Sequence, residues 1–382
     1  MASRLYLTTR PLFAHVLGVL TWLGLPAVGT PTTLLLAALY VTGLILLDAR
    51  QTQTRVTRFL PGRCHDALNR LLAHTPFSTR ALMGLFIQAV RRWGPPGYLM
   101  LDDVVVEKAF AKKLPWAGWT YSFAKKRKVY GLHVVVLVWC SLGGRWRLPV
   151  AFRLWRPKRS CSPADYHTKL QLAEQMVKEV VAAGLCCEYV VFDGHYTAGW
   201  FTKMLARLGL IWHGTLDPKT IVIWRGERLA VSALGERLRL KWRSHLEVRA
   251  TAVRVYAPSY GMLRLVVTRN RHGNFEYLAS NDLPTDLTRM VVRKRSRWSV
   301  ETVFRDTKQF AGLQACQCWV DAAMVRHVGL VLLTFVVLQM LRVRADEPVG
   351  AVKERWQLAT LCQGALPPPP LKACPAHLRA TA

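Results

Sequence analysis

The segment RSRWSVETVFRDTK, from Arg295 to Lys308, carries the most specific pattern in the chain. Val300, Val303 and Phe310 recur at helical spacing, so the pattern predicts an amphipathic helix with one apolar side. A helix of this kind buries its apolar side and leaves its polar side for solvent or for a site.

One acid and two bases share the polar side of this predicted helix. Arg297, Glu301 and Lys308 stand at offsets of 0, 4 and 11, which at ~100° per residue places them within an arc of roughly 40°. Arg297 and Glu301 can form an i,i+4 ion pair on a solvated face. Alternatively Glu301, the only carboxylate between Arg289 and Arg305, has a chemical role. The rest of the chain is needed to separate these interpretations.

The charge balance indicates a polyanionic partner. The chain of 382 residues has 53 Lys and Arg against 23 Asp and Glu, a formal net charge of +30. Nucleic acid is the usual partner of so basic a protein, and an anionic membrane surface is the alternative. With 51% hydrophobic residues the chain can bury a sizeable core, in two domains or in one large domain with an insertion.

The nine cysteines favour a reduced protein. Cys186 and Cys187 are adjacent, Cys316 and Cys318 are separated by one residue, and no pair of CxxC motifs occurs. This spacing fits free thiols better than a disulfide framework or a zinc site. No signal peptide with a small-residue cleavage site is visible, so we expect a cytoplasmic location.

The N-terminal region is predicted to be helical. Residues 12–47 contain no Asp, Glu, Lys or Arg, but Pro26 and Pro31 divide them. The longer piece, Thr33 to Leu47, is shorter than the ~20 residues that span a bilayer, so we expect two buried helices rather than membrane spans. Short helices with basic faces follow as far as residue 96. They predict either a DNA-binding region or an ordinary helical bundle.

Two predicted strands lead to acidic residues. After a break at residues 94–97, the apolar stretch YLML predicts a short strand that ends at Asp102 and Asp103. The buried stretch CCEYVVF ends at Asp193. Between them we expect two strands joined at Gly143-Gly144 and an amphipathic helix. Sites in mixed sheets assemble at strand ends, so these acids are candidates for a site.

A basic and aromatic loop follows the first of these strands. It contains the run Lys125, Lys126, Arg127 and Lys128 and the rings of Trp116, Trp119, Tyr121 and Phe123. Cations can bind phosphates and rings can stack on unpaired bases, so the loop predicts a nucleic-acid contact. The alternative is a solvated loop whose rings belong to the core.

Asp102, Asp193 and Glu301 are therefore the carboxylates that stand out. Three carboxylates in a strongly basic chain favour a site for two metal ions. Two Mg²⁺ ions, for which Mn²⁺ can substitute, would activate a nucleophile and stabilise the leaving oxygen of a phosphodiester. The alternative is that the two Asp residues cap turns and that Glu301 forms surface ion pairs.

At these residues the sequence resembles the DDE transposases of bacterial insertion sequences, the group with the Y-(2)-R-(3)-E-(6)-K signature. Arg297, Glu301 and Lys308 match its spacing, while Lys294 stands where the signature has Tyr. YVVFDGHYT resembles the segment around the second Asp of that family. LDDVVVEK resembles the segment around its first Asp, although Val104 replaces the usual Thr or Ser. The resemblance covers most of the chain.

The resemblance implies an α/β fold with a ribonuclease-H-like mixed sheet, flanking helices and a β-rich insertion. It also implies Mg²⁺-dependent cleavage at transposon ends, followed by attack of the 3′-hydroxyl on target DNA. Arg297 and Lys308 would bind phosphates of the transposon end, and Lys294 would replace the tyrosine contact by a salt link to DNA. Of the neighbours Asp102 and Asp103, the family spacing favours Asp102 as the first ligand.

The expected organisation is an N-terminal helical region at 1–96, a catalytic domain at 97–345 with the β-rich insertion at about 211–290, and a C-terminal tail at 346–382 that contains four prolines. A member of the family would act on terminal inverted repeats and on target DNA, as a homodimer in the nucleoid of a bacterial cell and without a membrane. One alternative is an inactive DNA-binding relic, because of the changes at Lys294 and Val104. A membrane protein is another, because of the apolar residues 12–47 and 328–341.

Overall fold

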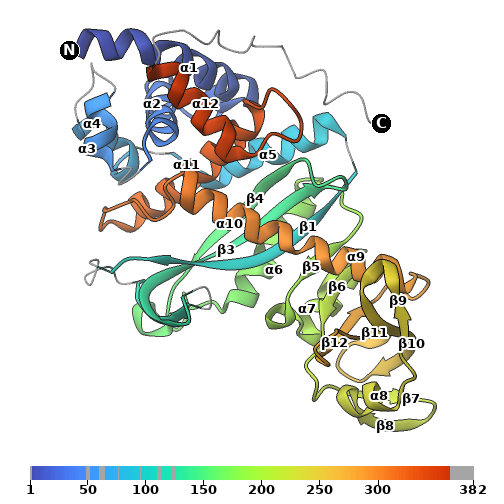
Figure 1. Ribbon diagram of the computed structural model, residues 1–382. Helices are drawn as coiled ribbons and strands as arrows, with labels where there is room; N and C mark the ends of the chain where they lie inside the picture. The colour runs from blue at the N-terminus through green and yellow to red at the C-terminus, as the bar shows by residue number, and fades with distance from the viewer. Residues whose placement is uncertain are drawn as a thin grey trace.

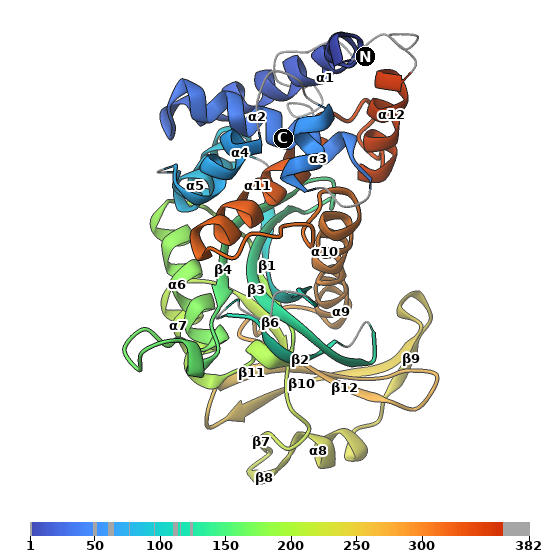
Figure 2. The same cartoon turned by 90° about the vertical axis from the view of Figure 1, so that its left-hand side faces the viewer.

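The computed structural model describes residues 2–48, 52–59, 65–75, 77–94, 96–109, 114, 116–122 and 125–361 (Figure 1). A mixed sheet carries helices on both faces, and a layer of further helices lies against one side of it (Figures 1 and 2). The four C-terminal prolines of the expected tail, and Phe123 of the basic loop, lie outside the described residues.

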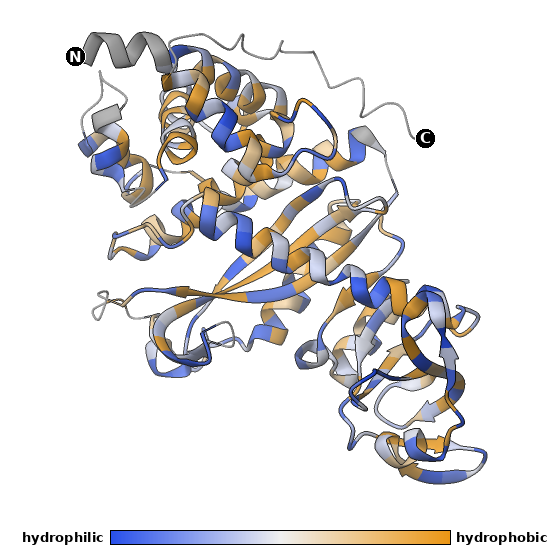
Figure 3. Ribbon diagram, in the orientation of Figure 1, coloured by the Kyte–Doolittle hydropathy of each residue, from blue (hydrophilic) through white to orange (hydrophobic). Residues whose placement is uncertain are grey.

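The N-terminal residues form the expected helices. These are α1 (Ala2–Leu23), α2 (Pro31–Leu46), α3 (Gln53–Phe59), α4 (His65–Ala73) and α5 (Thr79–Trp93). Helix α2 begins after Thr30, whose side-chain oxygen accepts the Thr33 N–H at 3.1 Å and so caps the helix. Most of α2 is apolar and buried, which confirms it as a core helix (Figure 3).

The central sheet has the strand order β4-β3-β1-β5-β6. The strands are β1 (Gly97–Glu107), β3 (Arg127–Ser141), β4 (Arg147–Trp155), β5 (Val190–Phe192) and β6 (Trp212–Thr215). β1, β3 and β4 are antiparallel, while β5 and β6 run parallel to β1. This mixed order is that of a ribonuclease-H-like core, so the predicted fold class is confirmed. β2 (Gly118–Ser122) pairs with the first residues of β3.

Strand β1 passes the two acids instead of ending at them. It pairs with β3 along its whole length, but with β5 only from Leu99 to Leu101. Asp102 therefore comes directly after the parallel section of β1, and Asp193 comes directly after β5. Adjacent parallel strands thus deliver two carboxylates to the same edge of the sheet.

Helices cover both faces of the central sheet (Figure 2). One face carries α6 (Lys169–Ala182) and α7 (Gly199–Arg207), and the other carries α9 (Leu287–Ser296) and α10 (Trp298–Phe310). The helix predicted from the signature segment is present, with a break at Arg297, where α9 ends and α10 begins.

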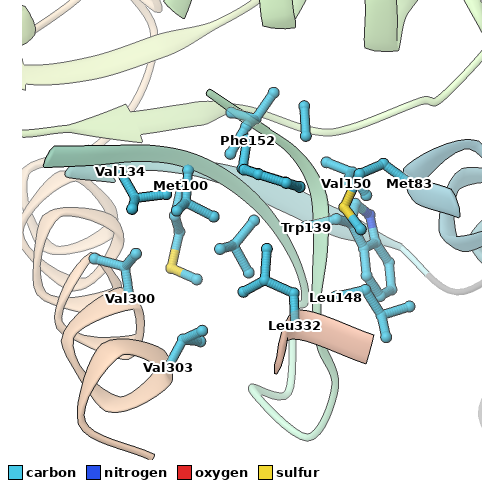
Figure 4. Packing of buried hydrophobic residues seen from close by; sticks show 14 of the residues in the cluster. Met83, Met100, Val134, Trp139, Leu148, Val150, Phe152, Val300, Val303 and Leu332 are labelled. Carbon is cyan, nitrogen blue, oxygen red and sulfur yellow. The ribbon is translucent and has the colours of Figure 1, made fainter. Parts of the chain in front are cut away.

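Helix α10 is fixed by its apolar side. Val300 and Val303 are fully buried and point toward Met100 of β1 and Val134 of β3 (Figure 4). Met100 and Asp102 are two residues apart, so both point to the α10 face of the strand. Burial of the valines thus places the polar side of α10 next to the first acid.

The β-rich region is also present, but its first strand, β6, belongs to the central sheet. The other elements are β7 (Ile221–Trp224), β8 (Glu227–Ala230), α8 (Val231–Arg237), β9 (Lys241–Arg243), β10 (Val248–Ala257), β11 (Gly261–Arg269) and β12 (Phe275–Ser280). β12 pairs antiparallel with β6. Core and insertion therefore share one sheet of twelve strands.

Helix α11 (Asp321–Met340) runs between the helical layer and the sheet (Figure 1). Within the described ranges it is the one helix long and apolar enough to cross a membrane, and 83% of its apolar window is buried inside the protein. It packs against α2, α4 and α5 and against α10. α11 is thus a core helix of this fold.

Residues 349–361, which the sequence assigned to the tail, form helix α12 (Val349–Leu361). It packs against α1, α2, α10 and α11. The buried Lys353 amine donates to the Leu47 carbonyl at 2.6 Å and to the Phe310 carbonyl at 3.0 Å. One hydrophobic cluster runs from Leu12 to Trp356, so the N-terminal helices and the sheet share a core.

Candidate active site

Arg297 joins two of the three candidate acids. Its Nη1 donates to Asp102 Oδ2 at 2.7 Å, and its Nη2 donates to Glu301 Oε1 at 3.0 Å. The i,i+4 pair expected on the helix is therefore present, but the face is not simply solvated, because the Arg297 side chain is only 18% exposed. The pair belongs to a site that includes a residue 195 positions earlier in the chain.

Asp193 completes the group from the neighbouring strand. Its Oδ1 accepts the N–H of His195 at 2.9 Å, which caps the short 3-10 helix Gly194–Tyr196. Burial, followed by the negative charge of Asp193, raises the pKa of Asp102 to about 7, although the Arg297 charge opposes the rise. The carboxylates of Asp102 and Asp193 thus lie close enough to repel each other at this strand edge, and Glu301 is linked to Asp102 through Arg297.

Asp103 points to the opposite face of β1. Its carboxylate accepts hydrogen bonds from Lys169 Nζ at 2.6 Å, from the His133 ring at 3.0 Å and from Tyr196 Oη at 3.1 Å. Burial acts to raise its pKa, but the His133 hydrogen bond and the Lys169 charge together hold it at about 2. The structure therefore places Asp102, and not Asp103, with the other two acids.

Sequence reasoning missed this second network. Side chains alternate between the two faces of a strand, so the sequence could have predicted that Asp102 and Asp103 point to opposite faces. No local pattern marks the partners His133, Lys169 and Tyr196, because the sheet order brings them together.

The two remaining bases of the signature lie beside the acids rather than among them. Lys294 Nζ is 3.6 Å from Glu276 Oε1 on β12, and burial lowers the pKa of this lysine. Burial also lowers the pKa of Lys308, which lies near Glu107 and Lys125 at the far end of β1. Lys294 interacts electrostatically with Arg297 and Asp193, whereas Lys308 does so with Glu107 and Lys125. Neither lysine pairs with Asp102, Asp193 or Glu301 in the described contacts.

The basic run lies where the chain turns from β2 into β3: Lys125 and Lys126 are in the turn, and Arg127 and Lys128 are the first residues of β3. Lys125, Lys126, Arg127 and Lys128 are all exposed. Lys125 Nζ donates to Glu107 Oε2 at 2.7 Å, which ties the turn to the end of β1. Lys126 has a φ of 50°, a left-handed conformation that non-glycine residues adopt mainly in turns.

The donor chemistry of the site fits a divalent cation of the Mg²⁺ type, because carboxylate oxygens are its preferred protein ligands. Burial and the Asp193 charge raise the pKa of Asp102 in spite of the Arg297 charge, and a bound cation would oppose this rise further. No three acidic, histidine or cysteine groups in the described part of the chain stand together as a ready-made metal site. Arg297 instead supplies the positive charge shared by Asp102 and Glu301.

A ribonuclease-H-like sheet with carboxylates on two adjacent strands defines a nuclease of the DDE type. A family model described as DDE superfamily endonuclease matches residues 25–254, more than half of the chain. The chain belongs to this family, which implies DNA as its substrate. The matched range contains Asp102 and Asp193 and ends before Glu301, so the third acid rests on the geometry alone. No curated protein matches the chain.

Proposed function

We propose that the protein is the transposase of a bacterial insertion sequence. It cuts DNA at the terminal inverted repeats of the element and joins the ends to target DNA, acting as a homodimer in the cytoplasm without a membrane. The observation that carries the proposal is the Arg297 bridge between Asp102 and Glu301 beside Asp193. It unites the R-(3)-E part of the signature helix with the two strand-end acids.

Asp102, Asp193 and Glu301 are proposed to hold two Mg²⁺ ions, for which Mn²⁺ can substitute. Bound ions of this kind activate a nucleophilic oxygen and stabilise the leaving oxygen of a phosphodiester. The chain supplies the negative charge that binds them, and its burial of Asp102 excludes water from one side of the site. Arg297, Lys294 and Lys308 are proposed to bind phosphates of the transposon end.

The test is strand nicking of a duplex that carries the inverted repeat flanking the coding region. We expect cleavage at the repeat with Mg²⁺ or Mn²⁺ and none in EDTA. The second candidate is a DNA-binding relic, which the pairing of Lys294 with Glu276 favours because a lysine in that ion pair is less available to DNA. Tight, specific binding without any nicking in either metal would establish the relic instead.

The first prediction concerns the exposed turn at 125–128. DNA affinity should fall steeply with salt, since every neutralised phosphate releases counterions. Replacing Lys125, Lys126 and Lys128 by Ala should weaken binding to all sequences alike and flatten the salt slope by about one for each phosphate that is no longer bound. Fluorescence anisotropy at several salt concentrations measures both. Lys178 is an exposed lysine on α6, and Lys178→Ala is the matched control. An equal effect of this change would mean that residues 125–128 do not form a specific DNA contact.

A second prediction separates the bases of the signature helix from its acid. Arg297→Ala and Lys308→Ala should each weaken binding of the repeat by roughly 10- to 150-fold, because a hydrogen bond to a charged phosphate contributes roughly 1.5–3 kcal/mol. Glu301→Gln should leave binding within about 2-fold, since its amide keeps the shape of the acid. Titration of a labelled repeat in EDTA distinguishes the three variants. A decrease of the same size in all three would mean that the helix is only a structural support.

A further inference from the structure

A cavity of about 480 Å³ lies behind the site, between β2, β3, β4 and the start of α6. Its walls include the rings of Trp116, Trp119 and Trp155, together with the cations Arg159 and Lys169. Binding pockets for small organic molecules have volumes of this order. No Asp or Glu is among the described residues that line it, and although Lys169 pairs with Asp103 behind the wall, Arg159 is not held by an acid in the described contacts. The cavity therefore favours a ligand with a flat ring and an anionic group.

Two glycines lie in the wall of the cavity. Gly118 of β2 and Gly131 of β3 are direct cross-strand partners, so this part of the wall carries no side chains. A Cβ on Gly118 would lie 2.8 Å from Arg159 Nη2. The Arg159 guanidinium thus lies directly against Gly118, and its Nη2 donates to the Ala117 carbonyl at 3.1 Å.

The rings and cations have different tasks. Trp119 is 72% exposed, an unusual state for so large an apolar ring, and it stands edge-on to Tyr130. Trp116 is buried and is covered by the Arg156 guanidinium, 4.1 Å from its ring centroid. Trp119 is thus the ring available to stack on a ligand, while Arg159 keeps donors for an anionic group.

The cavity is continuous with the elements proposed to hold DNA. β2 and β3 form one wall, and the exposed basic run at 125–128 leads into β3. Lys169 and the His133 ring also line the cavity, and both bind Asp103, the residue next to Asp102. A DNA strand held at the turn therefore has a short path to the cavity.

We propose that this cavity binds one unpaired nucleotide of a DNA strand, with its base stacked on Trp119 and its phosphate at Arg159 and Lys169. Stacking of a base on an aromatic ring adds affinity whatever the base, so this site distinguishes unpaired from paired nucleotides and does not recognise a particular sequence. The inference rests on DNA as the substrate, which the proposed function shares, but not on cleavage.

The experiment compares two duplexes of equal length in EDTA, one fully paired and one with a single unpaired 2-aminopurine. We expect the full-length protein to bind the second about 10-fold more tightly and to quench its fluorescence. Trp119→Ala should remove the preference, Trp119→Phe should keep most of it, and Arg159→Gln should reduce it. Trp242→Ala, which removes an exposed tryptophan of the insertion, is the matched control and should change nothing.

Any one of three results would contradict the proposed site. The unaltered protein could bind both duplexes equally, Trp119→Ala could keep the full preference for the unpaired nucleotide, or Trp242→Ala could remove that preference as completely as Trp119→Ala does. Free dAMP that binds tightly while the unpaired nucleotide in DNA adds nothing would assign the cavity to mononucleotides and overturn the DNA assignment. Because no metal is present, the result is independent of nicking. A protein that nicks the repeat but shows no preference contradicts only this inference, and one that shows the preference without nicking contradicts only the proposed reaction.

Discussion

Asp102→Asn, Asp193→Asn and Glu301→Gln are each expected to abolish metal-dependent nicking, with a loss on the order of 10³-fold or more. Each change keeps the shape of the side chain and removes a negative charge that would hold a cation. Several kcal/mol of transition-state stabilisation depend on that cation, and each 1.36 kcal/mol is tenfold in rate. Nicking of a labelled repeat under single-turnover conditions measures the loss, and thermal unfolding in EDTA shows whether each variant is folded.

Asp103→Asn is the control inside the same strand. Asp103 accepts hydrogen bonds from Lys169, His133 and Tyr196, so its replacement should lower the free energy of unfolding by about 1–3 kcal/mol. At a temperature where the variant is folded it should keep substantial nicking activity. If Asp103→Asn abolishes nicking and Asp102→Asn does not, the assignment of the first ligand is wrong while the site remains. Full activity of Glu301→Gln would exclude the three-acid site altogether.

Local periodicity accounts for what the sequence predicted well. The spacing of Val300 and Val303 predicted an amphipathic helix, and both side chains are buried where α10 lies on the sheet. The apolar stretches before Asp102 and Asp193 predicted two strands, which are β1 and β5. Each of these patterns depends only on residues within a few positions of each other, so the sequence alone carries them.

Contacts between distant segments could not be predicted in the same way. The contact of Arg297 with Asp102 depends on which strand lies under α10, and this follows from the sheet order. The end of β1 was placed too early because two charged residues in a row are typical of a turn, whereas pairing with β3 continues to Glu107. Helix α12 was missed because its mixed sequence acquires a buried side only against helices from distant parts of the chain, α1, α2, α10 and α11.

The unfolding free energy of the metal-free protein should depend on pH through Asp102. Its pKa is about 7 in the folded chain, against an ordinary value of 3.8, because it is buried and lies near Asp193. The folded state therefore holds this proton more tightly than the unfolded state does. Stability should fall as pH rises from about 4 to about 7 and then level off, with a total cost on the order of 4 kcal/mol.

Asp102→Asn removes this titration. In EDTA at pH 8 the variant should be more stable than the unaltered protein, by less than the full cost because it also loses the charged bond to Arg297. At pH 4 the two proteins should differ little, since Asp102 is then neutral in the folded chain. Urea unfolding at pH 4, 6 and 8 measures the difference. Added Mn²⁺ should stabilise the unaltered protein and not the variant, because only the former gains by binding the ion. A variant that is less stable by the same amount at every pH would contradict this prediction. It would mean that Asp102 stabilises the fold through its bond to Arg297, and that its charge does not destabilise the metal-free protein.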